Sequence, residues 1–319
     1  MSDQFTIHGF SEAVFIVADL ARTKQFYCDV IGWQARESGE CDQLFCQSWN
    51  LPTTVSAKTC LVCAPESKRG AIRLVELSGI EQDYMRANSQ IWDVGGIFDV
   101  NVRVNDSFAL ARELHDHQWF GANKPCEMTF GQFSVFEWLA KSHDGITHAL
   151  IERITPPLEN SELLSKFSPI FNASIVVNDH QSEQAFFEQV LGFTSLIEQT
   201  GTFERASSNV FGLPNNLVDK TPHQLSLLSA DGSRAGTIEI ASFPELQGND
   251  FSQQAQLPNI GIACLRFRID GIDAFVQHLI KQDVDLVSDV SLHLPSGILQ
   301  RNIVLKTPAG NCLAFYQER

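Results

Sequence analysis

The chain has 319 residues, of which 44% are hydrophobic and 19% are charged, a composition typical of globular rather than disordered proteins. Its 38 acidic and 23 basic residues give a net charge of −15, which argues against nucleic acid and anionic membranes as partners, because such a field repels them. No apolar run approaches the roughly 20 residues of a membrane span, and the start, MSDQFTIHGF, lacks a signal-peptide pattern, so we expect a cytoplasmic protein.

The first predicted unit is a strand, a turn and a helix over residues 12–33 (EAVFIVADLARTKQFYCDVIGW). Phe15 and Val17 alternate on one face of the strand. Asp19 follows where a helix N-cap accepts free backbone N–H groups, and Gly32 stands where a helix ends in the left-handed conformation. We therefore predict a helix capped by Asp19 and Gly32.

The same unit returns in residues 172–193 (NASIVVNDHQSEQAFFEQVLGF). The two segments align at a constant offset and without a gap. The matched pairs are Ala13 and Ala173, Val17 and Val177, Asp19 and Asp179, Phe26 and Phe186, Val30 and Val190, and Gly32 and Gly192. A repeat of this length indicates that one structural module has been duplicated.

A second kind of unit is also repeated, in residues 99–114 and 264–279. Each copy reads as a strand with alternating apolar residues that leads into an amphipathic helix. Closing strands follow in residues 144–152 and 309–317, each opened by a glycine turn. The chain therefore contains four copies of a strand-first module.

Together these units predict an α+β protein in which four β-α-β-β-β modules form two tandem domains with curled, cup-shaped mixed sheets. The length agrees with about two domains of ~150 residues each. Pro156, Pro157 and the polar residues after them indicate a linker. We expect modules at about 10–90, 96–155, 170–245 and 261–319, grouped into domains 1–155 and 169–319 around a linker over 156–168.

Three segments carry a resemblance to a known family. They are FYCDVIGW (26–33), FFEQVLGF (186–193) and TPAGNCLAF (307–315). In these the chain resembles the vicinal oxygen chelate superfamily, which includes glyoxalase I, bleomycin-resistance proteins and extradiol dioxygenases. The resemblance covers essentially the whole chain and implies a small-molecule site inside each curled sheet. It leaves the reaction open, because this fold hosts many chemistries.

The resemblance also implies where a metal would bind. In metal-binding relatives two modules supply up to four ligands to one divalent ion, one from the opening strand and one from the closing strand of each module. Here the opening positions hold Glu12, Asp99, Asn172 and Cys264, and the closing positions hold Arg73, Ala149, Glu239 and Ala314. No histidine stands among them, so the usual ligand set is absent and we assign no metal ligand, although a divalent metal stays open as a cofactor.

The first expected cup combines Glu12, Arg73, Asp99 and Ala149, with Arg103 on the same strand face as Asp99. Guanidinium groups would here supply the positive charge that relatives obtain from a metal. Because an arginine fork suits carboxylates and phosphates, the cup is expected either to hold an anionic substrate or to form a salt-bridged network without a ligand.

The second expected cup combines Asn172, Glu239, Cys264 and Ala314, with Arg266 on the same face as Cys264. We treat Asn172, Glu239, Cys264 and Arg266, with Arg73 and Arg103, as candidate substrate-binding residues. Cys264 is either a thiol whose pKa is lowered by Arg266 or an ordinary buried core cysteine.

Other candidate residues lie outside these positions. The run FGQFSVFEW (130–138) alternates aromatic residues on a predicted strand, and some of these rings are expected to line a pocket. His148 neighbours Ala149 and is expected to point away from the cup. His223 lies in a predicted middle or edge strand and is open to facing a pocket.

Two functions remain open on the sequence. The first is an enzyme, a lyase, isomerase or oxygenase, that acts on a small polar metabolite with Glu12 and Asp99 as the proton-transferring pair. The second is a metal-free protein that binds or sequesters a small molecule without turnover, as in the bleomycin-resistance members. In both cases the partner is a small molecule, and the chain is expected to be a monomer or a homodimer.

Overall fold

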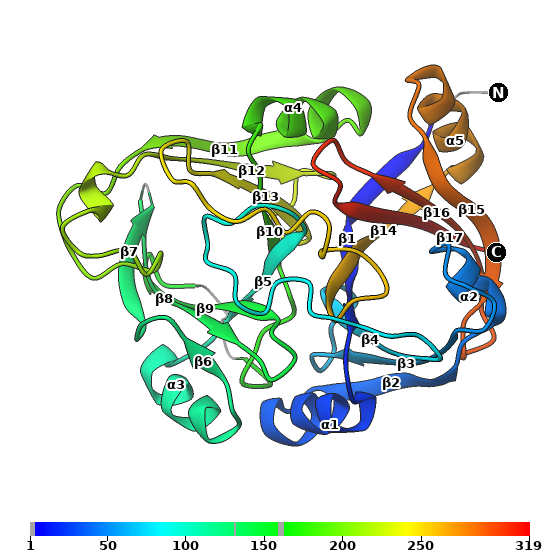
Figure 1. Ribbon diagram of the computed structural model, residues 1–319, viewed down its shortest axis with the longest axis horizontal. Coiled ribbons are helices and arrows are strands. Elements are labelled where there is room, and N and C mark those ends of the chain that lie inside the picture. The colour runs from blue at the N-terminus through cyan, green and yellow to red at the C-terminus, as the bar shows by residue number, and fades with distance from the viewer. Residues whose placement is uncertain (1–3, 131, 159–162) are drawn as a thin grey trace.

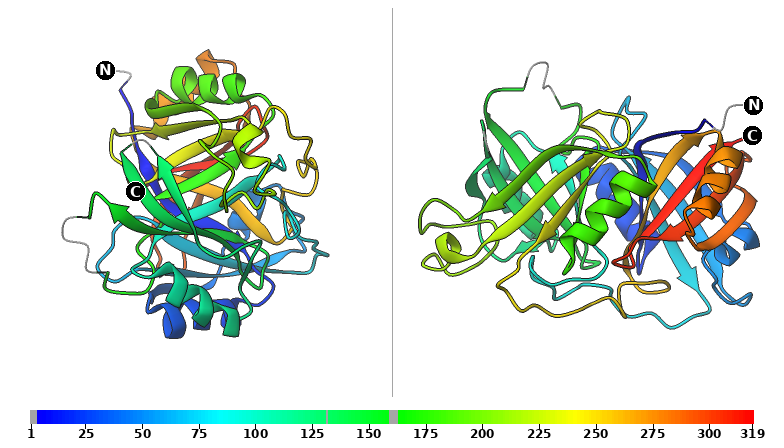
Figure 2. Two further views of the ribbon diagram at one scale, coloured as in Figure 1. Left: turned by 90° about the vertical axis from the view of Figure 1, so that its left-hand side faces the viewer. Right: turned by 90° about the horizontal axis from the view of Figure 1, so that it is seen from above.

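The computed structural model describes all residues except 1–3, 131 and 159–162, so part of the expected linker lies outside the described residues. The described chain forms two large mixed sheets that lie side by side, each curled around its own concave face (Figures 1 and 2). Each sheet combines two of the four modules. The predicted α+β fold of repeated modules with curled sheets is therefore confirmed.

The first sheet contains the first and fourth modules, and we call its concave side the outer cup because these modules lie outermost in the sequence. Its strands, in spatial order, are β15 (Leu286–His293), β16 (Leu299–Lys306), β17 (Cys312–Glu318), β14 (Gly261–Asp270), β1 (Thr6–Ile16), β4 (Ala71–Ser78), β3 (Ser56–Cys63) and β2 (Gln34–Glu40).

The second sheet contains the second and third modules, and its concave side is called the inner cup. Its strands, in spatial order, are β11 (Thr194–Gly201), β12 (His223–Ser229), β13 (Thr237–Ser242), β10 (Asn172–Val176), β5 (Ile97–Arg103), β9 (Thr147–Thr155), β8 (Phe133–Lys141) and β6 (Phe120–Gly121), with β7 (Cys126–Phe130) also paired to β8. Within the run 130–138, the first residue ends β7 and residues 133–138 belong to β8, so the run does not form a single strand.

The modules pair across these sheets differently from the expectation. β1 lies antiparallel to β14, with Ala13 opposite Leu265, and β5 lies antiparallel to β10, with Val100 opposite Ala173. The predicted cups of first with second module and of third with fourth module are therefore wrong. The physical reason is that the first strand of every module offers the same kind of hydrogen-bonding edge, so the repeat itself does not select a partner.

The first and second modules, and likewise the third and fourth, contact each other through their helices instead. The helices are α1 (Leu20–Gln25), α2 (Gln43–Gln47), α3 (Ser107–Asp116), α4 (His180–Ala185) and α5 (Ile272–Lys281), with π-helical turns over Phe26–Ile31 and Phe186–Val190 and a 3-10 turn over Val218–Lys220. In Figure 1 α1 lies near α3, and α4 lies near α5. Phe26 stacks on Trp119 at 4.9 Å between ring centroids, which joins the first two modules.

The predicted helix caps are confirmed. The side chains of Asp19 and Asp179 accept hydrogen bonds from the backbone N–H groups of Arg22 and Ser182. Gly32 has φ 86° and closes the first helical segment, as the left-handed C-cap requires. The sequence therefore predicted the local geometry of the first repeated unit correctly.

The two faces of each sheet have different roles. The faces turned toward the helices share one large core, to which β1 contributes Ala13, Phe15 and Val17. The alternate residues of the same strand, Val14 and Ile16, face the outer cup because side chains alternate along a strand. Within the described residues, no helix is long and apolar enough to span a bilayer.

Candidate functional site

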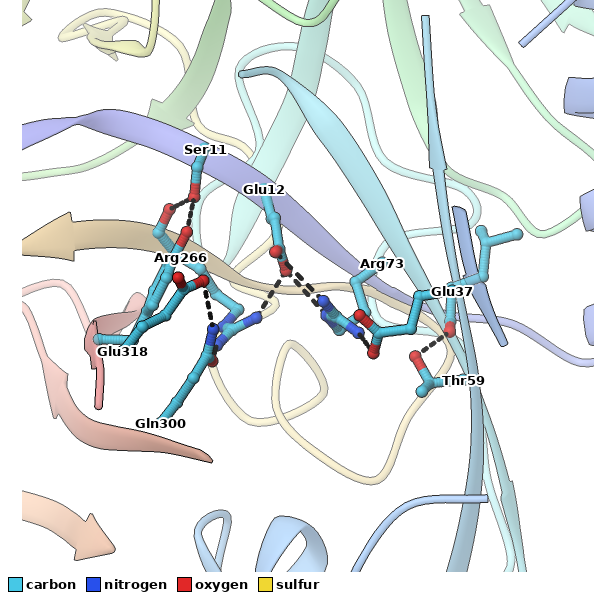
Figure 3. A network of polar contacts seen from close by, with 10 residues as sticks. Ser11, Glu12, Glu37, Thr59, Arg73, Arg266, Gln300 and Glu318 are labelled. Atoms are coloured by element: carbon cyan, nitrogen blue, oxygen red, sulfur yellow. Dashed lines mark hydrogen bonds and ion pairs between the residues drawn. The ribbon is translucent and has the colours of Figure 1, made fainter. Parts of the chain in front are cut away.

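The outer cup contains a buried network of charged side chains around Glu12 (Figure 3). Arg73 binds both carboxylate oxygens of Glu12, through Nε at 2.8 Å and Nη2 at 3.2 Å. Arg266 donates from Nη1 to Glu12 Oε2 at 2.6 Å and from Nη2 to Gln300 Oε1 at 2.8 Å. Arg73 also donates to Glu37 Oε1 at 3.1 Å. The predicted contact of Glu12 with Arg73 is thus present, and Arg266 joins them from the fourth module.

This network leaves Glu12 strongly acidic. Burial alone would raise the pKa of the carboxyl, but the guanidinium groups of Arg266 and Arg73 lower the pKa of Glu12 to about 2. Arg73 is 1% exposed and Arg266 4%. A carboxylate that already accepts hydrogen bonds from two arginines is a poor proton acceptor, so the geometry favours a structural role for Glu12.

The remaining ligand positions of the outer cup are apolar or thiol. Ala314 is buried beside β14, and Cys264 contacts Cys312 on the neighbouring strand. The hydrogen bond with Cys312 and burial together raise the pKa of the Cys264 thiol well above its usual value. Of the two expectations for Cys264, its complete burial among the apolar side chains of this cup favours an ordinary core cysteine.

The outer cup is filled by its own chain. The segment around α2 places Phe45, Trp49 and Leu51 against the concave face, and Leu292 and Leu294 close it from β15 and the loop that follows. Phe45 and Trp49 contact each other with ring centroids 4.5 Å apart. These side chains occupy the volume in which a ligand of this cup would lie.

The inner cup, in contrast, encloses a cavity of about 180 Å³. Aromatic side chains form much of its wall, and they come from strands and from the loops that cross the cup: Phe98, Phe133, Phe171, Phe211 and Phe243. His223 does not line this cavity; its ring packs against the ring of Phe211, with 5.2 Å between the ring centroids. A largely apolar wall with a few polar groups is the usual character of a small-molecule site.

One group of polar side chains forms the floor of this cavity. Asp99, Ser174 and Glu239 stand side by side on β5, β10 and β13, as the strand register shows. Two residues from Asp99 along β5 and two from Ser174 along β10, on the same face of the sheet, Asn101 lies opposite Asn172. The floor therefore holds Asp99, Asn172 and Glu239 together, which were expected in two different cups.

A third carboxyl group approaches from β8. Burial raises the pKa of Glu137 to about 8, assisted by the negative charges of Glu239 and Asp99. Burial likewise raises the pKa of Asp99 to about 7, against a hydrogen bond from Ser174, and that of Glu239 to about 7. We call Asp99, Glu137 and Glu239 the carboxyl cluster. Near neutral pH these groups share protons rather than ionise together.

Three arginines line the same cavity beyond Asn101. They are Arg103 on β5, Arg153 on β9 and Arg234 in the loop before β13, and we call them the arginine cluster. The guanidinium of Arg103 lies 4.3 Å from the ring centre of Phe171 and that of Arg153 lies 4.4 Å from that of Phe133. Burial lowers the pKa of Arg103 to about 10, with the charges of Arg153 and Arg234 acting in the same direction.

The arginine cluster has no counter-charge among the residues that the structure describes. None of its three guanidinium groups forms an ion pair there, and Arg153 Nε is buried without a hydrogen-bond partner. Arg103 was expected beside Glu12 and is instead in the other sheet, because β5 pairs with β10. For the same reason Glu12 and Asp99 do not face each other, and the predicted proton-transferring pair is wrong.

The residues at the implied ligand positions do not fit a metal centre. With the observed pairing, the inner cup combines Asp99, Ala149, Asn172 and Glu239, and the outer cup places the Arg73 guanidinium at one of its four positions. Among the described residues, no three His, Cys, Asp or Glu side chains come close enough together to hold an ion. We therefore derive no step through a metal.

Three candidate residues of the inner cup, Glu137, Arg153 and Arg234, do not stand at the ligand positions that the family resemblance implies. Glu137 lies on a middle strand, and Arg153 lies four residues beyond Ala149 on the closing strand. Both were detectable, since Glu137 shares a strand face with Phe133 and Val135, and Arg153 shares one with Ala149 and Ile151. Arg234 lies in a loop, where no sequence pattern marked it.

Comparisons with known proteins agree with this architecture. No protein-family profile matches the sequence, and no curated protein does either. Among solved structures, glyoxalase I from Zea mays is similar at 15% identity with a TM-score of 0.60, over 98% of this chain and 93% of that one. A mutant of the same maize enzyme gives 16% identity and a TM-score of 0.63, over 98% and 93%.

A Bacillus subtilis protein with the provisional name of a dioxygenase is also similar, at 10% identity and a TM-score of 0.59, over 98% of this chain and 85% of that one. At such identities the likeness concerns the fold and not the reaction. The matches extend over nearly the full length of both partners, and they include all four modules. By its four modules, its two curled sheets and these neighbours, the chain has the fold of the vicinal oxygen chelate superfamily.

Proposed function

We propose that the inner cup binds a small organic molecule that combines an apolar body with an anionic group. The observation that carries this proposal is a cavity of about 180 Å³ that has aromatic walls and an arginine cluster. Its volume exceeds the roughly 150 Å³ of an engineered protein cavity that binds benzene. A compact metabolite with one ring or a short alkyl chain therefore matches it in size.

The arginine cluster is the reason why we propose that the ligand carries an anionic group. Three like charges that converge without a counter-ion repel one another, and an anion placed among them would relieve this repulsion. The planar guanidinium fork binds carboxylates and phosphates through two parallel hydrogen bonds. Because Arg103 and Arg153 are held over aromatic rings, their positions are largely fixed before a ligand arrives.

The outer cup is proposed as the structural counterpart of this site. Its concave face is packed with side chains such as Phe45 and Trp49, and its charged groups satisfy one another. The two alternatives that the sequence left open for the first expected cup are thus proposed to be realised in different sheets: an internally compensated network in the outer cup and an open arginine cluster in the inner cup.

Calorimetric titration with octanoate tests the proposal, since this ion combines an alkyl chain with a carboxylate. We expect wild-type protein to bind it and Arg103→Gln to bind it at least tenfold more weakly. Arg36→Gln, which changes an exposed arginine on β2 in the other sheet, is the matched control and should bind like wild type. Equal affinity of all three proteins, or no binding to wild type, would contradict the proposed site.

The carboxyl cluster favours a second candidate function, an acid–base enzyme such as an isomerase or lyase. Carboxyl groups with pKa values near 7 can both donate and accept a proton at neutral pH, and environments of this kind gather at active sites. The oxygenase alternative is less favoured because it requires a redox metal, and the described residues do not provide its ligands.

Deuterium exchange distinguishes turnover from binding without knowledge of the product. A panel of small oxo acids would be incubated with the protein in heavy water, and solvent exchange at the carbon next to the carbonyl would be followed by NMR. An enzyme of this class exchanges that proton with wild-type protein and loses the exchange in Glu239→Gln. Oxo acids that bind without exchange would support the binding function instead.

A further inference from the structure

The floor of the inner cup presents hydrogen-bond acceptors without matching donors. Asp99 is 3% exposed and Asn101 is 5% exposed, and the Oδ1 atom of each lacks a hydrogen-bond partner. Both residues line the cavity. A buried acceptor left unpaired costs about 1–3 kcal/mol, so two of them side by side indicate a group that is supplied from outside the chain.

The neighbouring carboxyl groups also have too few hydrogen-bond donors. Ser174 Oγ donates to Glu239 Oε1 at 3.4 Å, a long hydrogen bond, and no side chain of the described residues donates to Glu137. Arg86 is the buried cation near this cluster. Its guanidinium donates hydrogen bonds to the backbone oxygens of Asp93 and Gly95 and packs against the ring of Phe98. The carboxyl cluster and Asn101 thus form a floor of acceptors that the protein itself satisfies only in part.

We infer that this floor binds an ammonium or similarly cationic donor group of the ligand, opposite the anionic group held by the arginine cluster. The inference rests on the proposed function and adds a second charge to its ligand. Asp99 and Arg103 lie on the same face of β5, four residues apart, which corresponds to roughly 13 Å along a strand. The ligand class is therefore a zwitterion whose charges are separated by a short apolar chain or ring.

An organic cation suits this floor better than a metal ion. A metal requires several ligand atoms at about 2 Å from one point, and the described acidic side chains do not converge in that way. An ammonium group has three N–H donors and can bridge acceptors that stand further apart.

Binding of a cation here should release protons. Burial and mutual repulsion keep the carboxyl cluster partly protonated at neutral pH, and Arg86 opposes this only in part at Asp99. A positive charge within the cluster favours its ionised form and lowers the pKa of these groups. Proton release therefore accompanies binding of the ammonium group and not of a simple anion.

Three probes of matched chain length test the inference: octanoate, octylamine, and aminooctanoate with its amine at the far end of the chain. Titrations at pH 7.5 in phosphate and in Tris reveal released protons, because these buffers differ in ionisation enthalpy. We expect aminooctanoate to bind at least tenfold more tightly than octanoate and to release protons.

Two variants assign this gain to the floor. Asp99→Asn and Glu239→Gln should lose most of the tenfold gain from the amine while keeping the affinity for octanoate. Glu40→Gln, an exposed change on β2, should keep both. Thermal unfolding checks that each variant is folded, and the preserved octanoate binding shows that the cavity is intact.

The outcomes separate this inference from the proposed function. If octanoate binds and the amine adds nothing, the cationic group is overturned and the anion site stands. If neither octanoate nor aminooctanoate binds, both proposals fall. If Mn²⁺ or Zn²⁺ alone binds tightly and Asp99→Asn abolishes this binding, the floor is a metal site and the organic cation is overturned.

Discussion

Glu12 and Asp99 occupy equivalent positions in two modules, yet their neighbours shift their pKa values in opposite directions. Arg73 and Arg266 bind Glu12 directly, so its carboxylate is the stable form. Asp99 faces the carboxyl groups of Glu239 and Glu137 and holds its proton to about pH 7. Burial raises the pKa in both cases, and the partner decides which effect prevails.

At Glu12 we predict a large loss of stability on substitution. Glu12→Gln keeps the size of the side chain but leaves Arg73 and Arg266 buried without their shared counter-charge, which should cost about 3–5 kcal/mol. Urea unfolding at pH 7 measures this cost. The exposed change Glu40→Gln should stay within about 0.5 kcal/mol of wild type, and a similar small effect for Glu12→Gln would contradict the prediction.

The same residue predicts sensitivity to acid. The pKa of Glu12 is lowered from 4.5 to about 2 in the folded protein, so its contribution to stability is complete above about pH 4.5. That contribution is lost as the pH falls from about 4.5 towards 2. The stability difference between wild type and Glu12→Gln should therefore shrink across this range.

At Glu137 the pH dependence of the contribution to stability is opposite to that at Glu12. Its pKa is raised from 4.5 to about 8 on folding, so its contribution is most favourable at low pH and declines as the pH rises towards 8. Glu137→Gln should therefore stabilise the ligand-free protein by a few kcal/mol more at pH 8 than at pH 5, since a pKa change of one unit corresponds to about 1.4 kcal/mol. Thermal unfolding at both pH values measures this. Equal destabilisation at the two values would show that Glu137 is an ordinary packed side chain.

Among the elements, the two sheets meet through close backbone contacts. Gly70, in the turn between β3 and β4, accepts a hydrogen bond from the backbone N–H of Ile170 at 3.0 Å, just before β10. The pseudo-equivalent contact on the other side is the bond from Phe10 N–H to the carbonyl of Gly236 at 3.1 Å. A side chain at Gly70 would place its Cβ 2.1 Å from the carbonyl oxygen of Ile170.

We therefore predict that Gly70→Ala is much more destabilising than Gly232→Ala. Both glycines have positive φ, 69° and 76°, which alone costs alanine about 1–2 kcal/mol. Only Gly70 also faces a neighbouring backbone, since nothing lies within 4 Å of a Cβ at Gly232. Urea midpoints of the two variants compare these costs directly. Equal midpoints would mean that the backbone at the junction between the sheets can shift to accommodate a side chain at little cost in stability.

The helices, strands and caps that are specified by residues close together in the sequence were predictable from it. Asp19, Phe26 and Gly32 specify strand, helix and cap within a few residues, and all were placed correctly. The partner of β1 was not predictable, because Ala13 and Leu265 meet through an edge that other modules also offer. The cup composition, and with it the separation of Glu12 from Asp99, follows from that long-range pairing.

At the scale of the whole molecule, duplication has produced two cups with the same backbone and different interiors. In the outer cup, aromatic side chains from the α2 segment and the Glu12 network pack against the concave face. In the inner cup, the same region remains open and is lined by the carboxyl and arginine clusters. The difference between the two interiors is the basis on which we propose a structural role for the outer cup and a binding role for the inner cup.

The pairing of the first module with the fourth has a consequence for synthesis on the ribosome. The second and third modules adjoin in the sequence, so the inner sheet has all its strands as soon as β13 has emerged. β1 is made first, but its partner β14 emerges only after the inner sheet is complete. The nascent chain therefore has all strands of its inner sheet before those of the outer sheet, whose two modules surround it in sequence. Until then, the edge of β1 is the surface most exposed to wrong pairing, where a chaperone would be of most use.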